Sequence, residues 1–190
     1  MFGLFKKPSK AKTAAVDLYE TVVTQARKPA FYLDLGVPDT PDGRYDMIMV
    51  HAFLVMHRLK RDHDEATETT QALFDLMFED MDKNLREMGA GDIGVSHRIK
   101  DMAKAFYGRI AVYENGLNEA PGSLEAAIER NVFRKSESVD GQIKAMADYM
   151  RRQVAVLGGQ ITAHLLSGQI EFEDPISVRP VDGSNLEARH

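Results

Sequence analysis

One stretch of the sequence decides the fold: Tyr45-Asp-Met-Ile-Met-Val50-His-Ala-Phe-Leu-Val55-Met-His-Arg-Leu-Lys60. Apolar side chains occur here at nearly every position rather than along one stripe. A helix that is apolar almost all the way round has to be covered by neighbouring elements on several sides. We therefore expect residues 45–60 to form a buried helix that other helices enclose.

Helical spacing of apolar residues continues on both sides of this stretch. The segments that show one apolar face are about 14–26, 69–88, 99–113, 123–133 and 143–157. Ser96 and Ser123 are expected to cap the helices that follow them. Turn-forming residues separate the segments at 36–44, 89–92, 115–122 and 158–159. No stretch alternates convincingly as a strand would, so we predict an all-α fold.

The domain limits follow from the same pattern. We predict a single compact multi-helix domain over residues 13–167, preceded by a flexible basic N-terminus (1–12) and followed by an extended or disordered tail (168–190). The length of 190 residues suits one core, and the apolar (44%) and charged (28%) fractions are those of a folded domain. The absence of cysteine excludes disulfides, thiolate metal sites and cysteine nucleophiles.

The charge pattern limits the partners that can be expected. A formal net charge of −5 gives no overall attraction to nucleic acid. No segment approaches the roughly 20 apolar residues that span a bilayer, which indicates a cytoplasmic protein. The start, Met1-Phe-Gly-Leu-Phe, is followed by four lysines: Lys6, Lys7, Lys10 and Lys12. This segment is either a solvated terminus or a contact with the ribosome or the inner-membrane surface.

A search for reactive groups finds no catalytic or cofactor-binding motif. Asp75, Glu79 and Asp82 share the solvent face of their helix, whereas Asp80 lies at the edge of the apolar face and needs an interior hydrogen-bond or ion-pair partner. A metal-binding enzyme that uses Asp75, Glu79, Asp80 and His57 remains an alternative. The cations Arg98, Lys100, Lys104 and Arg109 are interpreted as a solvated face, with a contact to RNA or lipid headgroups as the alternative.

Five motifs, taken in order, resemble one known family. They are Val37-Pro38-Asp39-Thr40-x-x-Gly43-Arg44, His51-x-Phe53-Leu54, Phe74-Asp75-x-x-Phe78-x-Asp80, Gly89-x-Gly91-Asp92 and Phe106-Tyr107-Gly108-Arg109. Together they are similar to the ubiquinol–cytochrome c chaperone family, over about residues 15–165. Each motif alone is weak, but all five at compatible spacing are specific.

The resemblance implies a helical assembly factor that is not an enzyme and needs no cofactor. Mitochondrial members bind newly synthesised cytochrome b near the ribosome and work with a small partner protein, so both are implied partners. An apolar face lined by residues 45–60 and 73–88 is our hypothesis for the client site. The motif residues that either contact the client or hold the fold are Pro38, Asp39, Thr40, Arg44, Phe53, Phe74, Phe78, Asp80, Gly91, Asp92, Tyr107 and Arg109.

Overall fold

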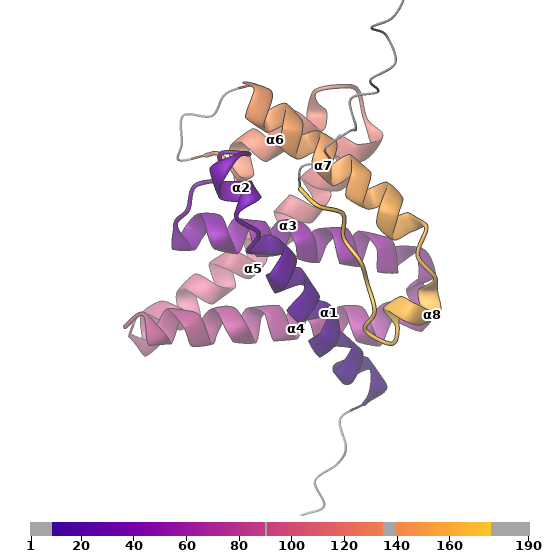
Figure 1. The fold of residues 1–190 in the computed structure, drawn as a ribbon. Helices are drawn as coiled ribbons and strands as arrows, with labels where there is room; N and C mark the ends of the chain where they lie inside the picture. Colours follow the sequence, from indigo (N-terminus) through magenta and orange to yellow (C-terminus); the bar gives the residue numbers. More distant parts are fainter. Residues whose placement is uncertain (1–8, 90, 135–139, 176–190) are drawn as a thin grey trace, which may run out of the picture.

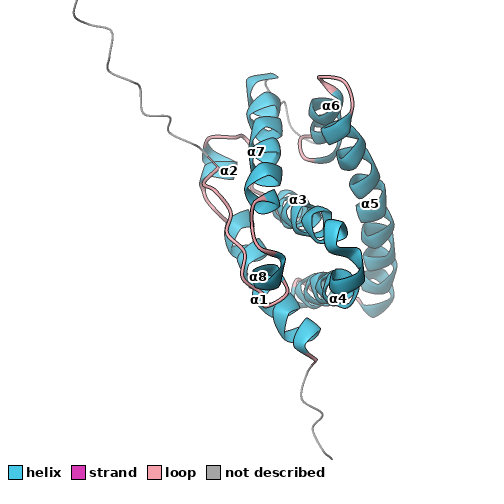
Figure 2. Cartoon of the chain, turned by 90° about the vertical axis from the view of Figure 1, so that its right-hand side faces the viewer, coloured by secondary structure: helices cyan, strands magenta, loops and turns pink. Residues whose placement is uncertain are grey.

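The centre of the molecule is helix α3 (Pro41–Leu59), around which the other helices are arranged (Figures 1 and 2). The structure is a computed structural model that describes residues 9–89, 91–134 and 140–175. Helix α3 buries almost every residue from Asp46 to Met56 because it contacts α1, α4, α5 and α7. This confirms the prediction made from its continuous apolar sequence.

Four further long helices and one of nine residues enclose α3. Helices α1 (Lys10–Ala26) and α4 (His63–Glu87) pack on each other and on α3. Helix α5 (Asp92–Asn118) packs on α4 and on α6 (Ser123–Asn131), and α6 in turn contacts α7 (Asp140–Gly158). The remaining elements are short: α2 (Ala30–Leu33), the 3-10 turn η1 (Lys60–Asp62) and α8 (Thr162–Leu165). All regular secondary structure in the described ranges is helical, and one continuous core joins these helices, which confirms the predicted fold class.

Several expected helix boundaries are wrong. Helix α3 begins at Pro41, inside the predicted turn over 36–44, and α4 begins at His63 rather than near residue 69. Ser96 lies inside α5, which already begins at Asp92, and α6 is capped by Gly122 rather than Ser123. The predicted break at residues 115–116 is absent, because α5 continues to Asn118. Gly116 serves close packing instead: a Cβ there would lie 2.7 Å from the Cα of Leu124. Glycine therefore lets α6 cross α5 at short distance.

The two ends of the predicted domain also differ from expectation. Helix α1 starts at Lys10, so Lys10 and Lys12 are helical, whereas Lys6 and Lys7 lie outside the described residues. After α8, residues 169–175, here named the strap, run as an extended segment beside α1 and α7 (Figure 1). The strap is packed, since Ile170 is buried in the core. Among the described helices, none has a stretch both long and apolar enough to cross a membrane.

Candidate functional site

A pocket of about 370 Å³ opens between α3, α4 and α5. Helix α3 forms its floor, and α4 and α5 supply two walls. The rings of Phe78 on α4 and Phe106 on α5 are in contact, with centroids 6.1 Å apart. The lining residues are Phe53, Met56, His57, Leu59, Lys60, His63, Ala66, Thr67, Thr70, Gln71, Phe74, Tyr107, Ile110 and Glu114. Most of the exposed wall is apolar, and apolar surface gains free energy when it is covered.

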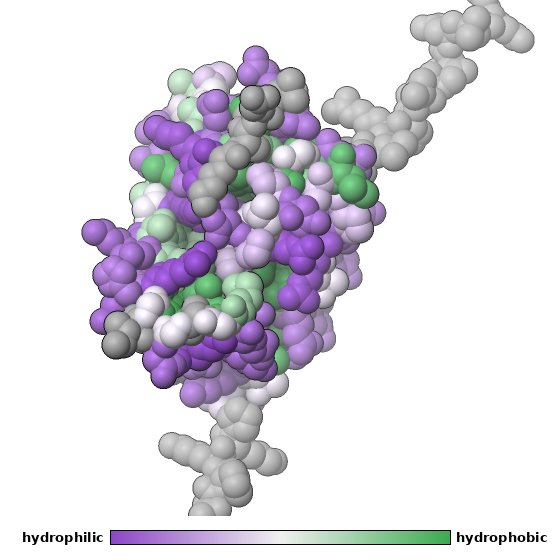
Figure 3. Space-filling model, turned by 90° about the vertical axis from the view of Figure 1, so that its left-hand side faces the viewer, coloured by the Kyte–Doolittle hydropathy of each residue, from purple (hydrophilic) through white to green (hydrophobic). Residues whose placement is uncertain are grey.

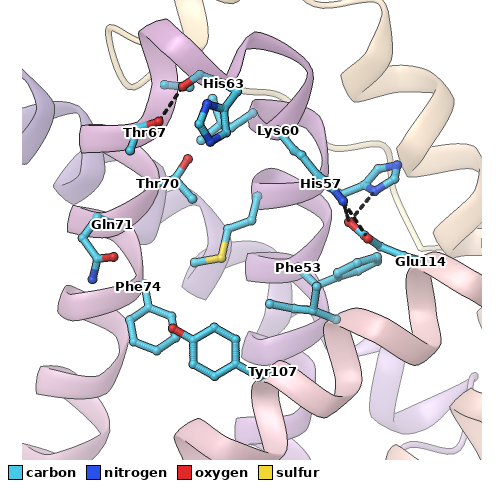
Figure 4. Close-up of a pocket in the computed structure, with 14 residues that line it drawn as sticks. Phe53, His57, Lys60, His63, Thr67, Thr70, Gln71, Phe74, Tyr107 and Glu114 are labelled. Carbon is cyan, nitrogen blue, oxygen red and sulfur yellow. Dashed lines mark hydrogen bonds and ion pairs between the residues drawn. The ribbon is translucent and has the colours of Figure 1, made fainter.

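Aromatic rings form one end of the pocket (Figure 4). The Phe74 and Tyr107 rings lie 5.3 Å apart between centroids, and Phe74 also packs against Phe78 at 4.8 Å. Phe53 on the floor lies 5.3 Å from the buried ring of Tyr113. Tyr107 remains 59% exposed, so this aromatic end has no covering element among the described residues. Large aromatic surface of this kind is typical of binding sites for apolar side chains.

Charged groups form another side of the pocket. Lys60 donates to both carboxylate oxygens of Glu114 at 2.9 and 2.8 Å, and His57 Nδ1 lies 3.7 Å from the same carboxylate. The Nδ1 atom of His57 is buried and has no hydrogen-bond partner in the described part of the chain. On the α4 wall, the Thr67 hydroxyl donates to the His63 carbonyl at 2.6 Å. The pocket is therefore apolar with a polar rim, in which His57 Nδ1 lies at ion-pair distance from Glu114 without a hydrogen bond.

Some of the sequence-predicted residues line the pocket, and the others lie in other parts of the fold. Phe53, Phe74 and Tyr107 come together in the pocket, and Phe78 supports Phe74 from behind without lining the cavity. The Lys60–Glu114 pair was not predicted, because those residues are 54 positions apart and meet only when α5 packs beside the end of α3.

The Pro38–Arg44 motif builds the start of α3. Thr40 caps the helix by accepting a hydrogen bond from the Gly43 amide at 3.1 Å. A Cβ on Gly43 would lie only 2.0 Å from the Pro38 carbonyl oxygen, so the loop closes on the helix only with glycine at this position. Asp39 and Arg44 pair at 2.7 Å on the surface, and this contact lowers the pKa of Asp39. These side chains thus have local structural partners.

Asp80 has the interior partner that its position required. The Tyr19 hydroxyl donates to Asp80 Oδ2 at 2.8 Å, and burial together with this hydrogen bond raises the pKa of Tyr19. The metal-site alternative is not supported by placement, because Asp75 and Glu79 line a small hollow with Lys12 while His57 faces the α3–α4–α5 pocket. In the described ranges no three histidine or acidic side chains gather as a metal site would need.

The interpretation of the α5 cations as a solvated face is wrong for Arg109. Its guanidinium is buried and pairs with Asp46 at 2.8 Å, and Arg134 pairs with the other oxygen of the same carboxylate at 2.5 Å. Burial raises the pKa of Asp46, and the two guanidiniums oppose that shift. Arg109 is therefore part of a buried charge cluster between α3 and α5.

The turn between α4 and α5 contains the last predicted pair. Gly91 caps α5 and Asp92 is its first residue, where it bonds to Arg86 at the end of α4. Gly89 takes the left-handed conformation expected after a helix end, with φ of +86°. The glycines and Asp92 of this turn are exposed, on the side of the molecule away from the pocket. That side is mainly hydrophilic, with small separate apolar areas (Figure 3).

Comparison with known proteins decides the family. The model of the family described as Ubiquinol-cytochrome C chaperone matches residues 33–172, which include all three pocket-forming helices. The chain belongs to the ubiquinol–cytochrome c chaperone family. The resemblance seen in the motifs is thus confirmed, and the family is one of chaperones rather than enzymes.

Individual members of the ubiquinol–cytochrome c chaperone family show how far the likeness extends. "Ubiquinol-cytochrome c reductase complex assembly factor 1" of Mus musculus is 23% identical over 172 residues, covering 90% of this chain and 58% of its own length. "Protein CBP3, mitochondrial" of Saccharomyces cerevisiae is 25% identical over 150 residues, or 76% of this chain and 44% of that protein. The chain thus spans less than two thirds of either relative.

A solved structure gives the strongest likeness in shape among these. The crystal structure of the Cbp3 homolog from Brucella abortus superposes with a TM-score of 0.78 at 34% sequence identity. The match covers 87% of this chain and 92% of that chain. The helical architecture is therefore that of a chaperone-family member over nearly its whole length.

Proposed function

We propose that the chain is an assembly chaperone for ubiquinol–cytochrome c reductase and that the α3–α4–α5 pocket holds an apolar segment of a newly made subunit. Family membership and the names of the relatives support the general role. The observation that carries the second part is the exposed ring of Tyr107 beside the half-buried ring of Phe74, both lining a cavity of about 370 Å³. Newly synthesised cytochrome b is the expected client, on the family resemblance.

The chemistry of the pocket suits temporary binding of a helix. A membrane protein exposes apolar side chains to water before it is inserted, and an open apolar groove covers one or two of them as anchors. Each large buried side chain contributes about 1.5–3 kcal/mol. Since association itself costs several kcal/mol, two anchors give weak binding that allows release into the membrane.

The other partners remain part of the proposal. A small partner protein, the ribosome and the inner-membrane surface are the expected neighbours of a chaperone that acts on the cytoplasmic side. The local charges at the start of α1 argue against a strong basic patch there, because Lys12 shares its hollow with Asp75 and Glu79. The other lysines of an electrostatic tether are Lys10, which is exposed at the start of α1, and Lys6 and Lys7, which lie outside the described residues.

The test has two levels. Deleting the gene should lower cytochrome b and assembled reductase in the membranes while other respiratory complexes stay intact. Complementation then examines the pocket: Tyr107→Asp places a charge among the aromatic rings and should fail to restore the reductase. Leu33→Asp is the matched control, because Leu33 is an apolar residue 81% exposed outside the pocket.

Each level has its own contradicting result. Normal reductase in the deletion strain would refute the chaperone function. Full restoration by Tyr107→Asp, at wild-type protein abundance, would leave the function standing and refute the pocket as the client site. Failure of both variants at normal abundance would also refute the assignment to this pocket.

A further inference from the structure

The segment that joins α3 to α4 faces the pocket on one side and the α7–α8 turn on the other. Its pocket-lining residues are His57, Leu59, Lys60 and His63. Arg58 and Asp62 lie between these residues in the sequence, and their side chains bond to residues 157–162 instead. Figure 1 shows α8 and the end of α7 at the same end of the molecule as the end of α3. One end of the pocket is therefore built on a segment that the C-terminal part of the chain holds from the opposite side.

Arg58 is the centre of these contacts. It is 6% exposed, its Nε donates to the Leu157 carbonyl at 3.0 Å, and its Nη2 donates to the Gln160 carbonyl at 2.9 Å. Leu157 belongs to the last turn of α7, where a cation interacts favourably with the helix dipole. A buried guanidinium without its partners is costly, so Arg58 holds the end of α3 against the end of α7.

Asp62 and Thr162 extend this network to the start of α4. Arg58 Nη1 donates to Asp62, the last residue before α4, and the Thr162 hydroxyl donates to Asp62 Oδ2 at 2.8 Å. The same hydroxyl accepts from Arg58 Nη2 at 3.1 Å. The bonds from Arg58 and Thr162 lower the pKa of Asp62, as expected for a carboxylate that accepts from a guanidinium and a hydroxyl. The network thus joins the end of α3, the start of α4 and the start of α8.

The turn η1 is the only connection between α3 and α4, and it is three residues long. A 3-10 segment between two helical stretches often marks a hinge. Helix α3 forms the floor of the pocket, and α4 forms the wall that includes Thr67, Thr70 and Phe74. The angle between the two helices at η1 therefore sets how far this wall stands from α5. Because Arg58 precedes η1 and Asp62 is its last residue, their bond spans the turn.

We propose that Arg58, Asp62 and Thr162 form the positioning network of the α3–α4–α5 pocket: they fix the angle between α3 and α4 and hold the pocket at the width that the structure shows. This inference rests on the proposed function of the pocket as a client site. None of the three residues lines the pocket, so they act on a client through the lining residues on α3, η1 and α4.

The width of the pocket can be measured without a client, because the chain contains no cysteine. Spin labels at Glu68→Cys on α4 and Ala111→Cys on α5, two exposed positions outside the pocket lining, report the distance between these helices by pulsed electron paramagnetic resonance. Thr162→Val removes the hydroxyl from the network and should broaden the distance distribution, whereas Thr162→Ser should keep the wild-type distribution. Tyr19→Phe is the matched control, because it removes a hydroxyl–carboxylate bond between α1 and α4 and should not broaden the distribution.

A peptide titration then tests the effect on binding. The probe is a fluorescein-labelled helical peptide that carries two phenylalanines four positions apart on a background of alanine, lysine and glutamate. A pocket whose width is not fixed is less preorganised, so Thr162→Val should weaken binding of this peptide about fivefold. Thr162→Ser and Tyr19→Phe should bind it as the wild type does.

The outcomes separate this inference from the proposed function. Equal distance distributions in the wild type and in Thr162→Val, or the same broadening in Tyr19→Phe, would overturn the positioning network. Equal peptide affinity of the wild type and Thr162→Val would overturn it as well. A peptide that does not bind the wild type, with the distances as expected, would instead overturn the pocket as a client site. If Thr162→Val does not fold, Asp62→Asn takes its place with the same expectations, because it weakens the bonds to Arg58 and Thr162.

Discussion

Acidification should destabilise this protein through one buried histidine, His51. Its ring is fully buried, with Nδ1 2.7 Å from the Met47 carbonyl and Nε2 2.7 Å from the Tyr149 hydroxyl. The tyrosine oxygen in turn accepts from Gln25 at 3.0 Å. The neutral ring satisfies this chain, since Nδ1–H donates to Met47 and Nε2 accepts from Tyr149. A proton on Nε2 would leave the tyrosine hydroxyl without its acceptor.

The magnitude follows from the shift in pKa. Burial lowers the pKa of His51 from 6.5 to about 4. The unfolded chain therefore binds a proton that the folded chain rejects, so the contribution to stability is fully present above pH 6.5 and is lost as pH falls toward 4. A shift of this size corresponds to about 3 kcal/mol in total, of which about 2 kcal/mol is lost between pH 7 and pH 5.

Urea unfolding at several pH values measures this loss, with His51→Gln as the control. Glutamine at this position does not titrate, so the variant should keep a nearly constant free energy of unfolding between pH 7 and pH 5. The window matters because the carboxylates with lowered pKa, Asp62 and Glu125 among them, lose their contribution only at lower pH. Equal losses in the wild type and in His51→Gln over this window would refute the assignment to His51.

Three other changes should have measurable effects on stability. Asp46→Ala leaves two arginines without their buried carboxylate and should cost about 3–5 kcal/mol in urea unfolding, whereas a cost under about 1 kcal/mol would show that the cluster is solvated. Tyr19→Phe should cost about 1.5–3 kcal/mol, and most of that cost should vanish in an Asp80→Asn background; additive effects would contradict the hydrogen bond. Gly43→Ala should cost about 1–3 kcal/mol or more because the added methyl group meets a carbonyl oxygen, whereas Gly141→Ala, which meets nothing within 4 Å, should not lower the melting temperature.

The spacing of apolar residues within single segments was enough to predict the helices. It was not enough where a residue contacts a segment distant in the sequence. The continuous apolar run correctly predicted that α3 is a buried helix, although its first turn from Pro41 was expected to be loop. The position of Asp80 on the helical wheel predicted an interior partner. Gly116 looked like a break because glycine is a poor helix former, but its close contact with Leu124 keeps it in the helix. Arg109 looked solvated because its partner Asp46 lies on another helix. Such contacts have no signature in the neighbouring sequence.

The candidate sites divide in the same way. Aromatic residues of the motifs, including Phe74 and Tyr107, indicated the pocket, whereas its charged rim required knowing that α5 lies beside the end of α3. From its sequence the strap was predicted to be part of a polar tail. Its packed position is explained by Gln25 on α1 and Gln153 on α7, which bond to the main chain of Glu173. Sequence therefore predicted what one helix face can supply and missed what two or more elements build together.

The bond between Gln25 and Glu173 joins residues 148 positions apart, nearly the two ends of the described chain. Contacts of such wide separation form late, because the intervening chain has to be ordered first. During synthesis, the helices from α1 to α7 leave the ribosome before the strap does, so the contacts of Glu173 form only after the long helices have emerged. A chain cut short before Glu173 would keep every long helix, but Gln153 would lose its main-chain partner and Gln25 would keep only Tyr149. Quality control could therefore recognise the missing end through a loosened core rather than through a missing helix.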